Sequence, residues 1–334
     1  MSEKILLSHG AGGRMTHELV ESMFLKNFRN DALEKLDDAA LLDIEPGRIA
    51  FTTDAFVVKP VFFPGGDIGK LAVCGTVNDL AVMGAKPIAL SAAVIIEEGF
   101  ETLALEKIVL SMRDAAASAG VNIVCGDTKV VEKGGADGIF IATAGIGVLR
   151  SGSRISGRNA GPGDCVILSG TIGDHGISVL QARGEYELEG IVQSDCAPLN
   201  GIIKRLLDIC PEVRVLRDPT RGGLATTLNE IAKSSGVRVE IFENALPVLP
   251  SVKTACGILG IDPLYVANEG KFVAFLPDSF ADQAVLALKE HPLGRNTVKI
   301  GRVIGGKPGV EMVTSIGGRR PLRMLEGEQL PRIC

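Results

Sequence analysis

The sequence predicts a mixed α/β (α+β) protein of two domains, and three observations support this fold class. Its 334 residues exceed what one ordinary core needs and suffice for two domains with substantial interiors. In both halves, apolar runs typical of strands alternate with stretches of helical period. Residues 151–163 are rich in glycine and contain a proline, which is typical of a linker. We therefore predict domains at 1–150 and 164–316, followed by a tail at 317–334.

The order of elements follows from the hydrophobic period. Short apolar runs are assigned to strands, and longer runs with apolar residues every three or four positions are assigned to helices. The first domain is predicted to contain strands at 49–53, 88–96, 122–125 and 139–148 and helices at 67–84 and 103–119. The second is predicted to contain strands at 165–169, 237–242 and 271–276 and helices after Asp174 and at 202–209 and 223–235. After Val313 the sequence turns polar without a regular period, so the tail is expected to be mobile.

Composition and charge exclude several classes of function. Lys and Arg number 35 against 40 Asp and Glu, and the resulting net charge of −5 offers no attraction for nucleic acid. The apolar runs fall far short of the roughly 18 residues that a membrane helix needs, and the N-terminus lacks the layout of a signal peptide. We therefore expect a cytoplasmic protein that binds neither nucleic acid nor a membrane.

The cysteines point to one unusual residue. The chain has 7 Cys without a Cys-x-x-Cys pair, a spacing that argues against zinc, an iron–sulfur cluster or a disulfide framework. Cys334 differs from the others because it is the last residue. An exposed, reactive thiol is one interpretation of this position, and a frayed terminus that happens to end in Cys is the other.

Acidic residues recur in apolar or glycine-rich surroundings, and the chain has no P-loop motif to bind phosphate. They include Asp38, Asp54, Asp79, Asp127 and Asp218. Asp79 is the most informative, because an unpaired carboxylate within its apolar stretch would be costly. Mg²⁺ prefers oxygen ligands and bridges phosphates, so we predict a nucleotide site whose metal ligands are Asp38, Asp54, Asp79 and Asp218. Helix hydrogen bonds for Asp79, and turn or cap roles for Asp54 and Asp127, are the alternatives.

Two glycine-rich loops, at 8–13 and 169–176, offer backbone N–H groups that could cradle phosphate. Gly12 and Gly13 in the first loop, and Thr220 beside Asp218, complete the predicted nucleotide contacts. The alternative for each loop is a turn that exists for packing alone.

Five motifs, taken in order, resemble one family over essentially the whole chain. They lie at 62–72, 75–81, 126–131 and 268–271 and at the terminal Pro331-Arg332-Ile333-Cys334. The chain resembles HypE, the family of hydrogenase expression/formation proteins, and the terminal motif is the most specific part of the match. This family is similar in turn to aminoimidazole ribonucleotide synthetase, selenophosphate synthetase and thiamine monophosphate kinase.

The resemblance implies a two-domain fold like that of aminoimidazole ribonucleotide synthetase, in a homodimer built on the N-terminal domains. It implies that the carbamoyltransferase HypF loads a carbamoyl group onto Cys334. The chain would then dehydrate this group to a thiocyanate with ATP and Mg²⁺, and the cyano group would pass to iron on a complex of HypC and HypD. The product would supply the cyanide ligands of nickel–iron hydrogenase.

The dehydration needs a base and cations beside the reacting group. Glu269 is our candidate for the base, with a turn glutamate as the alternative. Lys129 could pair with the transferring phosphoryl group or be a solvated lysine, and His9 could polarise phosphate, shuttle a proton or have a packing role. Arg221 could clamp phosphate or pair with a carboxylate.

Two other functions stay open on the sequence alone. One is a small-molecule kinase or selenophosphate synthetase of the same fold, which would have no use for a terminal Pro-Arg-Ile-Cys. The other is a scaffold that binds nucleotide as a regulatory ligand and docks a maturation factor through its tail.

Overall fold

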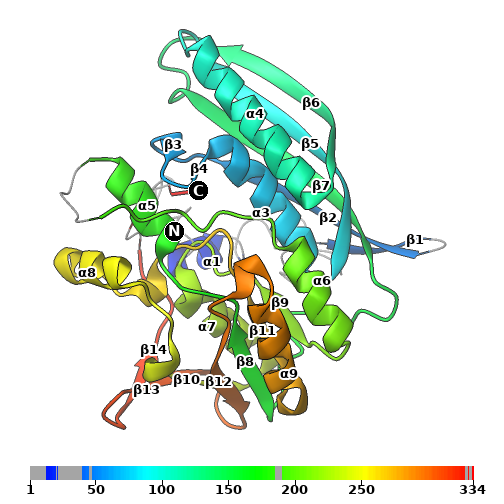
Figure 1. Cartoon of the computed structure of the whole chain (residues 1–334), viewed down its shortest axis with the longest axis vertical. Helices are drawn as coiled ribbons and strands as arrows, with labels where there is room; N and C mark the ends of the chain where they lie inside the picture. The colour runs from blue at the N-terminus through cyan, green and yellow to red at the C-terminus, as the bar shows by residue number, and fades with distance from the viewer. Residues whose placement is uncertain are drawn as a thin grey trace.

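The structure is a computed structural model that describes residues 13–19, 21, 40–44, 47–184, 190–327, 330 and 333–334. It contains two mixed sheets, each covered by helices (Figure 1). Among the described residues, no helix is both long and apolar enough to cross a membrane.

The first sheet has five strands in the order β1-β2-β7-β5-β6. Its strands are β1 (Ala40–Ile44), β2 (Gly47–Phe56), β5 (Ala85–Glu97), β6 (Asn122–Val131) and β7 (Ile139–Leu149). Neighbouring strands are antiparallel except β5 and β6, which are parallel. Helices α3 (Ile68–Val82) and α4 (Thr102–Ala119) pack against each other and lie along this sheet (Figure 1). A two-stranded ribbon of β3 (Phe62–Phe63) and β4 (Gly66–Asp67) leads into α3.

Helix α3 is buried on nearly all sides because it serves both domains. Asp67 caps its first turn by accepting hydrogen bonds from the backbone N–H groups of Gly69 and Lys70, at 2.7 and 3.1 Å. One side of the helix packs under the first sheet, and Ala81 and Val82 at its end join the core of the second domain. A helix that is apolar all round is expected at such a junction.

The second sheet has seven strands in the order β14-β13-β10-β12-β8-β11-β9. They are β8 (Asp164–Leu168), β9 (Val215–Arg217), β10 (Arg238–Phe242), β11 (Val273–Pro277), β12 (Val298–Ile304), β13 (Gly309–Val313) and β14 (Arg319–Leu322). Only the β10–β13 pair of neighbours in this sheet is parallel.

Helices cover both faces of the second sheet. They are α6 (Asn200–Ile209), α7 (Gly223–Ser235) and α9 (Asp278–Lys289), whereas α5 (Asp174–Ala182) and α8 (Pro250–Leu259) pack against each other in a separate cluster. Helix α7 shares one core with the inward side chains of β8 and β10, whereas α6 and α9 share another with the opposite face. The described chain also contains the short helix α1 (Arg14–Leu19) and single 3₁₀ turns at Glu243–Ala245, Pro263–Tyr265 and Pro292–Gly294.

Two expectations about the elements were wrong, and several elements were not predicted. The strand predicted at 122–125 continues to Val131, because it pairs in parallel with β5 along that whole length. Residues 319–322 were expected to lack regular structure, but they form β14 and pair antiparallel with β13. No elements were predicted for α8, α9, β12 and β13, since their short apolar runs lack a clear period by themselves.

Asn78 ties the two domains together from the middle of α3. Its amide nitrogen donates to the carbonyl oxygens of Ala197 and Glu269 at 3.1 and 3.2 Å, and its amide oxygen accepts from the N–H of Leu199 at 2.7 Å. The residue is 1% exposed, so water does not replace these bonds readily.

We predict that Asn78→Ala lowers the free energy of unfolding by about 3 kcal/mol, because it leaves buried donors and acceptors unpaired. Urea unfolding followed by circular dichroism would measure the loss. Asn200→Ala is the matched control, since Asn200 makes one bond to a helix end, from its amide to the Ala119 carbonyl, and is only half-buried. Equal losses in the two variants would contradict the tie assigned to Asn78.

Candidate active site

The chain ends in a cavity between the two domains. The cavity measures about 50 Å³ and is lined by Asp54, Ala55, Phe56, Gly75, Asp79, Asp218, Thr220, Arg221, Glu269 and Cys334. These residues come from β2, α3, the loop after β9, the segment before β11 and the C-terminus. Pockets that take a whole ligand measure about 300–1,000 Å³, so this one suits a group of a few atoms on Cys334 rather than a nucleotide.

The last residues pack into the protein instead of projecting from it. Ile333 is 5% exposed and belongs to the core cluster that also holds Phe56, Cys74 and Cys196. Cys334 is partly buried against this cluster. Figure 1 shows the C-terminus between α5 and the turn that carries β4. The expectation of an exposed thiol was therefore wrong, because the terminal Ile333 gains more by burial than by solvation.

Asp54 and Asp79 form a carboxyl pair on the inner side of the first sheet. The Thr76 hydroxyl donates to Asp54 at 3.2 Å, and the Thr52 hydroxyl donates to Asp79 at 2.6 Å. Burial raises the pKa of the Asp54 carboxyl, while the Thr76 hydrogen bond and the Arg221 guanidinium oppose this. The predicted need of Asp79 for a partner is met in part by these neighbours.

Asp218 approaches the same cavity from the second domain. It is 8% exposed, and burial raises its pKa to about 6. The nearby Arg217 guanidinium opposes the rise, and the charge of Asp54 adds to it. Thr220 lines the cavity two residues later, where its backbone N–H donates to the Asp218 carbonyl oxygen at 3.0 Å.

Glu269 is the most deeply buried acid of the cavity, at 3% exposed. Burial raises its pKa well above the usual value, and the charges of Asp218 and Asp195 add to this while Arg221 opposes it. A carboxyl group with a raised pKa is a stronger base once it has lost its proton, which suits proton transfer near neutral pH.

The backbone around Glu269 is held by a second acid. Asp195 accepts from the N–H groups of Glu269 and Gly270, at 3.1 and 3.2 Å, and lies 3.8 Å from the Lys271 ammonium. A Cβ at position 270 would lie 1.8 Å from the Asp195 carbonyl oxygen, so only glycine fits there. In Asn268-Glu269-Gly270, the glycine is therefore required by the close approach of a second backbone segment, whereas the glutamate serves the chemistry.

Cys334 lines the same cavity as these acids. Burial raises the pKa of its thiol to about 12, Arg221 opposes the rise, and Glu269 and Asp54 add to it. The thiol and the Glu269 carboxyl group line the same small cavity. A docked, unmodified Cys334 is thus a neutral thiol, and neutral thiols are poor nucleophiles.

The structure does not bring all predicted residues to the cavity. Asp127 and Lys129 lie on β6, with 3.6 Å between their carboxylate and ammonium groups, and by register they face away from α3. Gly13 packs elsewhere, against the backbone of Leu325. His9, Gly12 and Asp38 lie outside the described residues.

The described residues of one chain do not supply a complete set of ligands for the predicted metal ion. The described residues contain no group of three or more His, Cys, Asp or Glu side chains placed to hold a metal ion by themselves. The three carboxyl groups of Asp54, Asp79 and Asp218 nevertheless line one cavity, and mutual repulsion and burial give them a need for positive charge. Oxygen donors of this kind fit Mg²⁺ together with water and phosphate oxygens.

Sequence reasoning missed two residues that build the site. Arg221, for which the sequence left a phosphate clamp and a carboxylate partner open, is the cation that the cavity acids share. His175 was seen only as part of a glycine-rich loop, although its ring contacts the chain end. Asp195 carried no signal at all, because its role depends on two backbone N–H groups far away in sequence.

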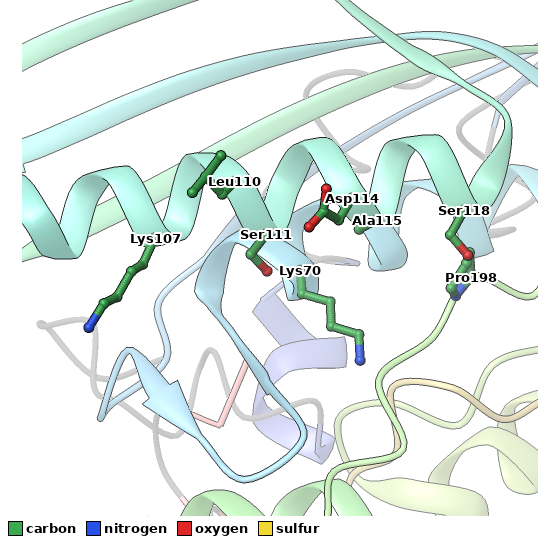
Figure 2. A pocket seen from close by; sticks show the side chains of 8 residues that line it. All are labelled: Lys70, Lys107, Leu110, Ser111, Asp114, Ala115, Ser118 and Pro198. Atoms are coloured by element: carbon green, nitrogen blue, oxygen red, sulfur yellow. The ribbon is translucent and has the colours of Figure 1, made fainter.

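A second, larger hollow lies between α3 and α4. Its volume is about 490 Å³, and Figure 2 shows Lys107, Ser111 and Ser118 of α4 along it, with Lys70 of α3 opposite. The Lys70 ammonium already donates to the Gly65 carbonyl oxygen at 2.8 Å. The hollow contains none of the residues around Cys334, so we place the chemistry in the smaller cavity.

Comparison with known proteins identifies this fold. Residues 36–149 match the family model described as "AIR synthase related protein, N-terminal domain", and residues 161–313 match its C-terminal counterpart. The chain therefore has the mixed α/β, two-domain architecture of AIR synthase-related proteins.

The similarity to one branch extends over the full chain. The carbamoyl dehydratase HypE of Cupriavidus necator is 52% identical over 335 aligned positions, covering 100% of this chain and 95% of that protein. The crystal structure of HypE in a HypE–HypF complex superposes with a TM-score of 0.88 at 52% identity, covering 92% of this chain and 99% of that one. A HypE structure in complex with ATP superposes with a TM-score of 0.84 at 48% identity, covering 99% and 100%. The chain belongs to the HypE family of carbamoyl dehydratases involved in hydrogenase maturation.

Proposed function

We propose that this chain uses ATP to dehydrate a carbamoyl group on the sulfur of its own Cys334, leaving a thiocyanate that supplies the cyanide ligands of nickel–iron hydrogenase. One observation carries this proposal. The last residue of the chain lies inside a cavity lined by Asp54, Asp79, Asp218 and Glu269, with Arg221 beside them. A tail used only for docking to another protein would have no need of that position.

The reaction divides into two steps that these residues can assist. The carbamoyl oxygen first attacks the γ-phosphorus of ATP, ADP leaves, and one N–H proton is lost. The second proton then leaves nitrogen, the carbon–oxygen bond breaks, and phosphate departs as the carbon–nitrogen triple bond forms. The sulfur–carbon bond remains intact throughout. Glu269 is the base in this scheme, because its carboxyl group lines the same small cavity as Cys334 and burial raises its pKa.

ATP and Mg²⁺ are supported by two independent considerations. A HypE protein of 48% identity binds ATP in a crystal structure. The cavity is too small for a nucleotide, so the bulk of ATP would lie outside it with the phosphates toward Asp54, Asp79 and Asp218. These carboxyl groups would hold magnesium, with Asp38 as a further ligand, and the metal when bound would neutralise phosphate charge. Gly12 and His9, which lie outside the described residues, remain predicted contacts of the nucleotide, whereas Gly13 lies against the backbone of Leu325.

The proposed partner proteins would act on Cys334 when it lies outside the cavity. A HypE of 52% identity forms a complex with HypF, which supports HypF as the source of the carbamoyl group. Because Cys334 is docked against Glu269, the tail has to leave the cavity for loading. It has to leave again to pass the cyano group to a complex of HypC and HypD. The predicted cytoplasmic location is consistent with these partners.

A homodimer is supported by the open face of the first sheet. The described residues leave large apolar side chains exposed on the side of the sheet away from α3, with Ile88, Ile146 and Val148 between 40 and 50% exposed. Single exposed apolar residues are ordinary, but a contiguous patch across several strands is typical of an interface. A second copy on this face would also cover Asp127 and Lys129. Lys129 could then act on a phosphoryl group only across the dimer, in the partner's site.

We predict that protein carbamoylated on Cys334 loses the mass of one water when given Mg-ATP, as measured by mass spectrometry of the C-terminal peptide. Cys334→Ala should show neither loading nor loss. ATP binding without loss of water would instead favour a scaffold. ATP-dependent turnover of a free substrate after removal of residues 331–334 would favour a small-molecule kinase or selenophosphate synthetase.

We predict that Glu269→Gln binds ATP with unchanged affinity but slows dehydration at least about a hundredfold, the range expected for losing a general base. Single-turnover mass spectrometry would give the rate. Asp262→Asn is the control, because Asp262 is an acid that caps a 3₁₀ turn and does not line the cavity. An undiminished rate in Glu269→Gln would remove Glu269 from the role of base.

We predict that Val148→Asp converts a dimer into a monomer, because it places a charge on the exposed apolar face of the first sheet. Size-exclusion chromatography with light scattering would measure the mass. Ile258→Asp on α8 is the control, since Ile258 is 65% exposed on another element. A dimer that survives Val148→Asp would place the interface elsewhere.

A further inference from the structure

The end of the chain is held by a histidine that none of the preceding chemistry uses. The Nε2 atom of His175 lies 2.9 Å from the carbonyl oxygen of Ile333, the residue before Cys334. A carbonyl oxygen can only accept, so Nε2 carries the hydrogen and donates it. His175 is 0% exposed, and burial lowers its pKa, so the ring is neutral.

The tautomer of this histidine is set from the other side of the ring. Nδ1 lies 2.8 Å from the Ser194 hydroxyl oxygen, and in a neutral ring that donates from Nε2 it must accept. Ser194 therefore donates its hydroxyl hydrogen to His175. Its oxygen accepts in turn from the backbone N–H of Cys196 at 3.1 Å. Three hydrogen bonds therefore run in one direction. The Cys196 N–H donates to Ser194, Ser194 donates to His175, and His175 donates to the Ile333 carbonyl oxygen.

Both domains fix the position of the ring. The edge of Phe63 packs against it at 5.3 Å between ring centres, with the planes at 85°. The carbonyl oxygen of Pro64 accepts from the Ser178 hydroxyl at 2.7 Å and from the Ser194 N–H at 2.8 Å. His175 is thus held by contacts that do not involve the tail, and the donor stays aimed when the tail departs.

We propose that His175 is a latch for the terminal segment: its Nε2–H holds the Ile333 carbonyl and, together with the burial of Ile333, keeps Cys334 in the cavity, so that loss of this bond shifts the tail toward release for loading. His175 acts on the reaction through position and does not touch the reacting atoms. A neutral hydrogen bond of this kind changes an equilibrium by roughly threefold to tenfold. That strength favours the docked tail without locking it, which suits a segment that has to dock and leave in each cycle. The use of the latch in catalysis rests on the proposed function, whereas the latch itself does not.

The test is the rate at which iodoacetamide alkylates Cys334 in the full chain without ATP, followed by mass spectrometry of the C-terminal peptide. His175→Phe keeps a ring but removes the donor, and we expect alkylation about tenfold faster. His175→Gln can present an amide N–H at a similar reach, and we expect a rate close to that of the unmodified protein. His291→Phe is the matched control, because His291 lies by a 3₁₀ turn remote from the tail and should leave the rate unchanged.

The buried Cys74 and Cys196 report on folding in the same experiment. If they stay unreactive in His175→Phe while Cys334 reacts no faster, the latch is disproved. If they react as well, His175→Phe has disturbed the fold, and Ser194→Ala becomes the variant that tests the latch. This variant removes the hydroxyl that sets the tautomer. A several-fold faster alkylation of Cys334 alone in that variant supports the latch, and an unchanged rate overturns it.

A second readout separates the latch from the dehydration chemistry. With HypF as the carbamoyl donor, His175→Phe should be loaded faster and dehydrated more slowly, because its tail spends more time outside the cavity. Slower loading together with slower dehydration would indicate general damage and would count against the latch. A latch confirmed by alkylation would stand even if loaded protein lost no water with ATP, since alkylation involves neither.

Discussion

The arrangement of this protein depends on the burial of several carboxyl groups around one cation. Asp54, Asp79, Asp218 and Glu269 line the same cavity, and the Arg221 guanidinium opposes the rise in the pKa values of Asp54 and Glu269. Acids held this close in a medium of low polarity cannot all be ionised unless further positive charge arrives. In the proposed reaction, magnesium would supply such charge. The same acids also raise the pKa of the docked thiol, so the groups that would hold the metal also keep the unmodified Cys334 protonated.

Keeping the acids in place requires a rigid backbone, and this comes from polar groups that take no part in chemistry. Asn78 bonds the backbone of Glu269 from the first domain, and Asp195 bonds it from the second. Gly270 permits the close approach of Asp195, which a side chain would prevent. Helix α3 belongs to two cores and also lines the cavity. Small changes at the junction of the domains would therefore move the residues of the site.

In the proposed reaction, the terminal segment has to move, whereas the backbone around the cavity stays in place. Apolar burial of Ile333 and the bond from His175 favour docking, while the need to meet other proteins favours release. A ligand or partner shifts such a docking equilibrium only by its difference in affinity for the docked and released states. In the proposed reaction the substrate is part of the enzyme's own chain, so docking would set its concentration at the cavity.

The sequence by itself determined the family, the mixed α/β class and the importance of Cys334, because these depend on motifs and periods that lie in short stretches. It also indicated Asp54, Asp79, Asp218 and Glu269 as acids in unusual surroundings, since an acid within an apolar stretch is visible without a structure. Only the tertiary structure decided which acids share a cavity, that Asp127 and Lys129 face away from it, and that Cys334 is docked rather than exposed. The contacts of His175 and Asp195 join residues 158 and 74 positions apart. Such contacts are set by the packing of whole domains, and no local pattern in the chain records them.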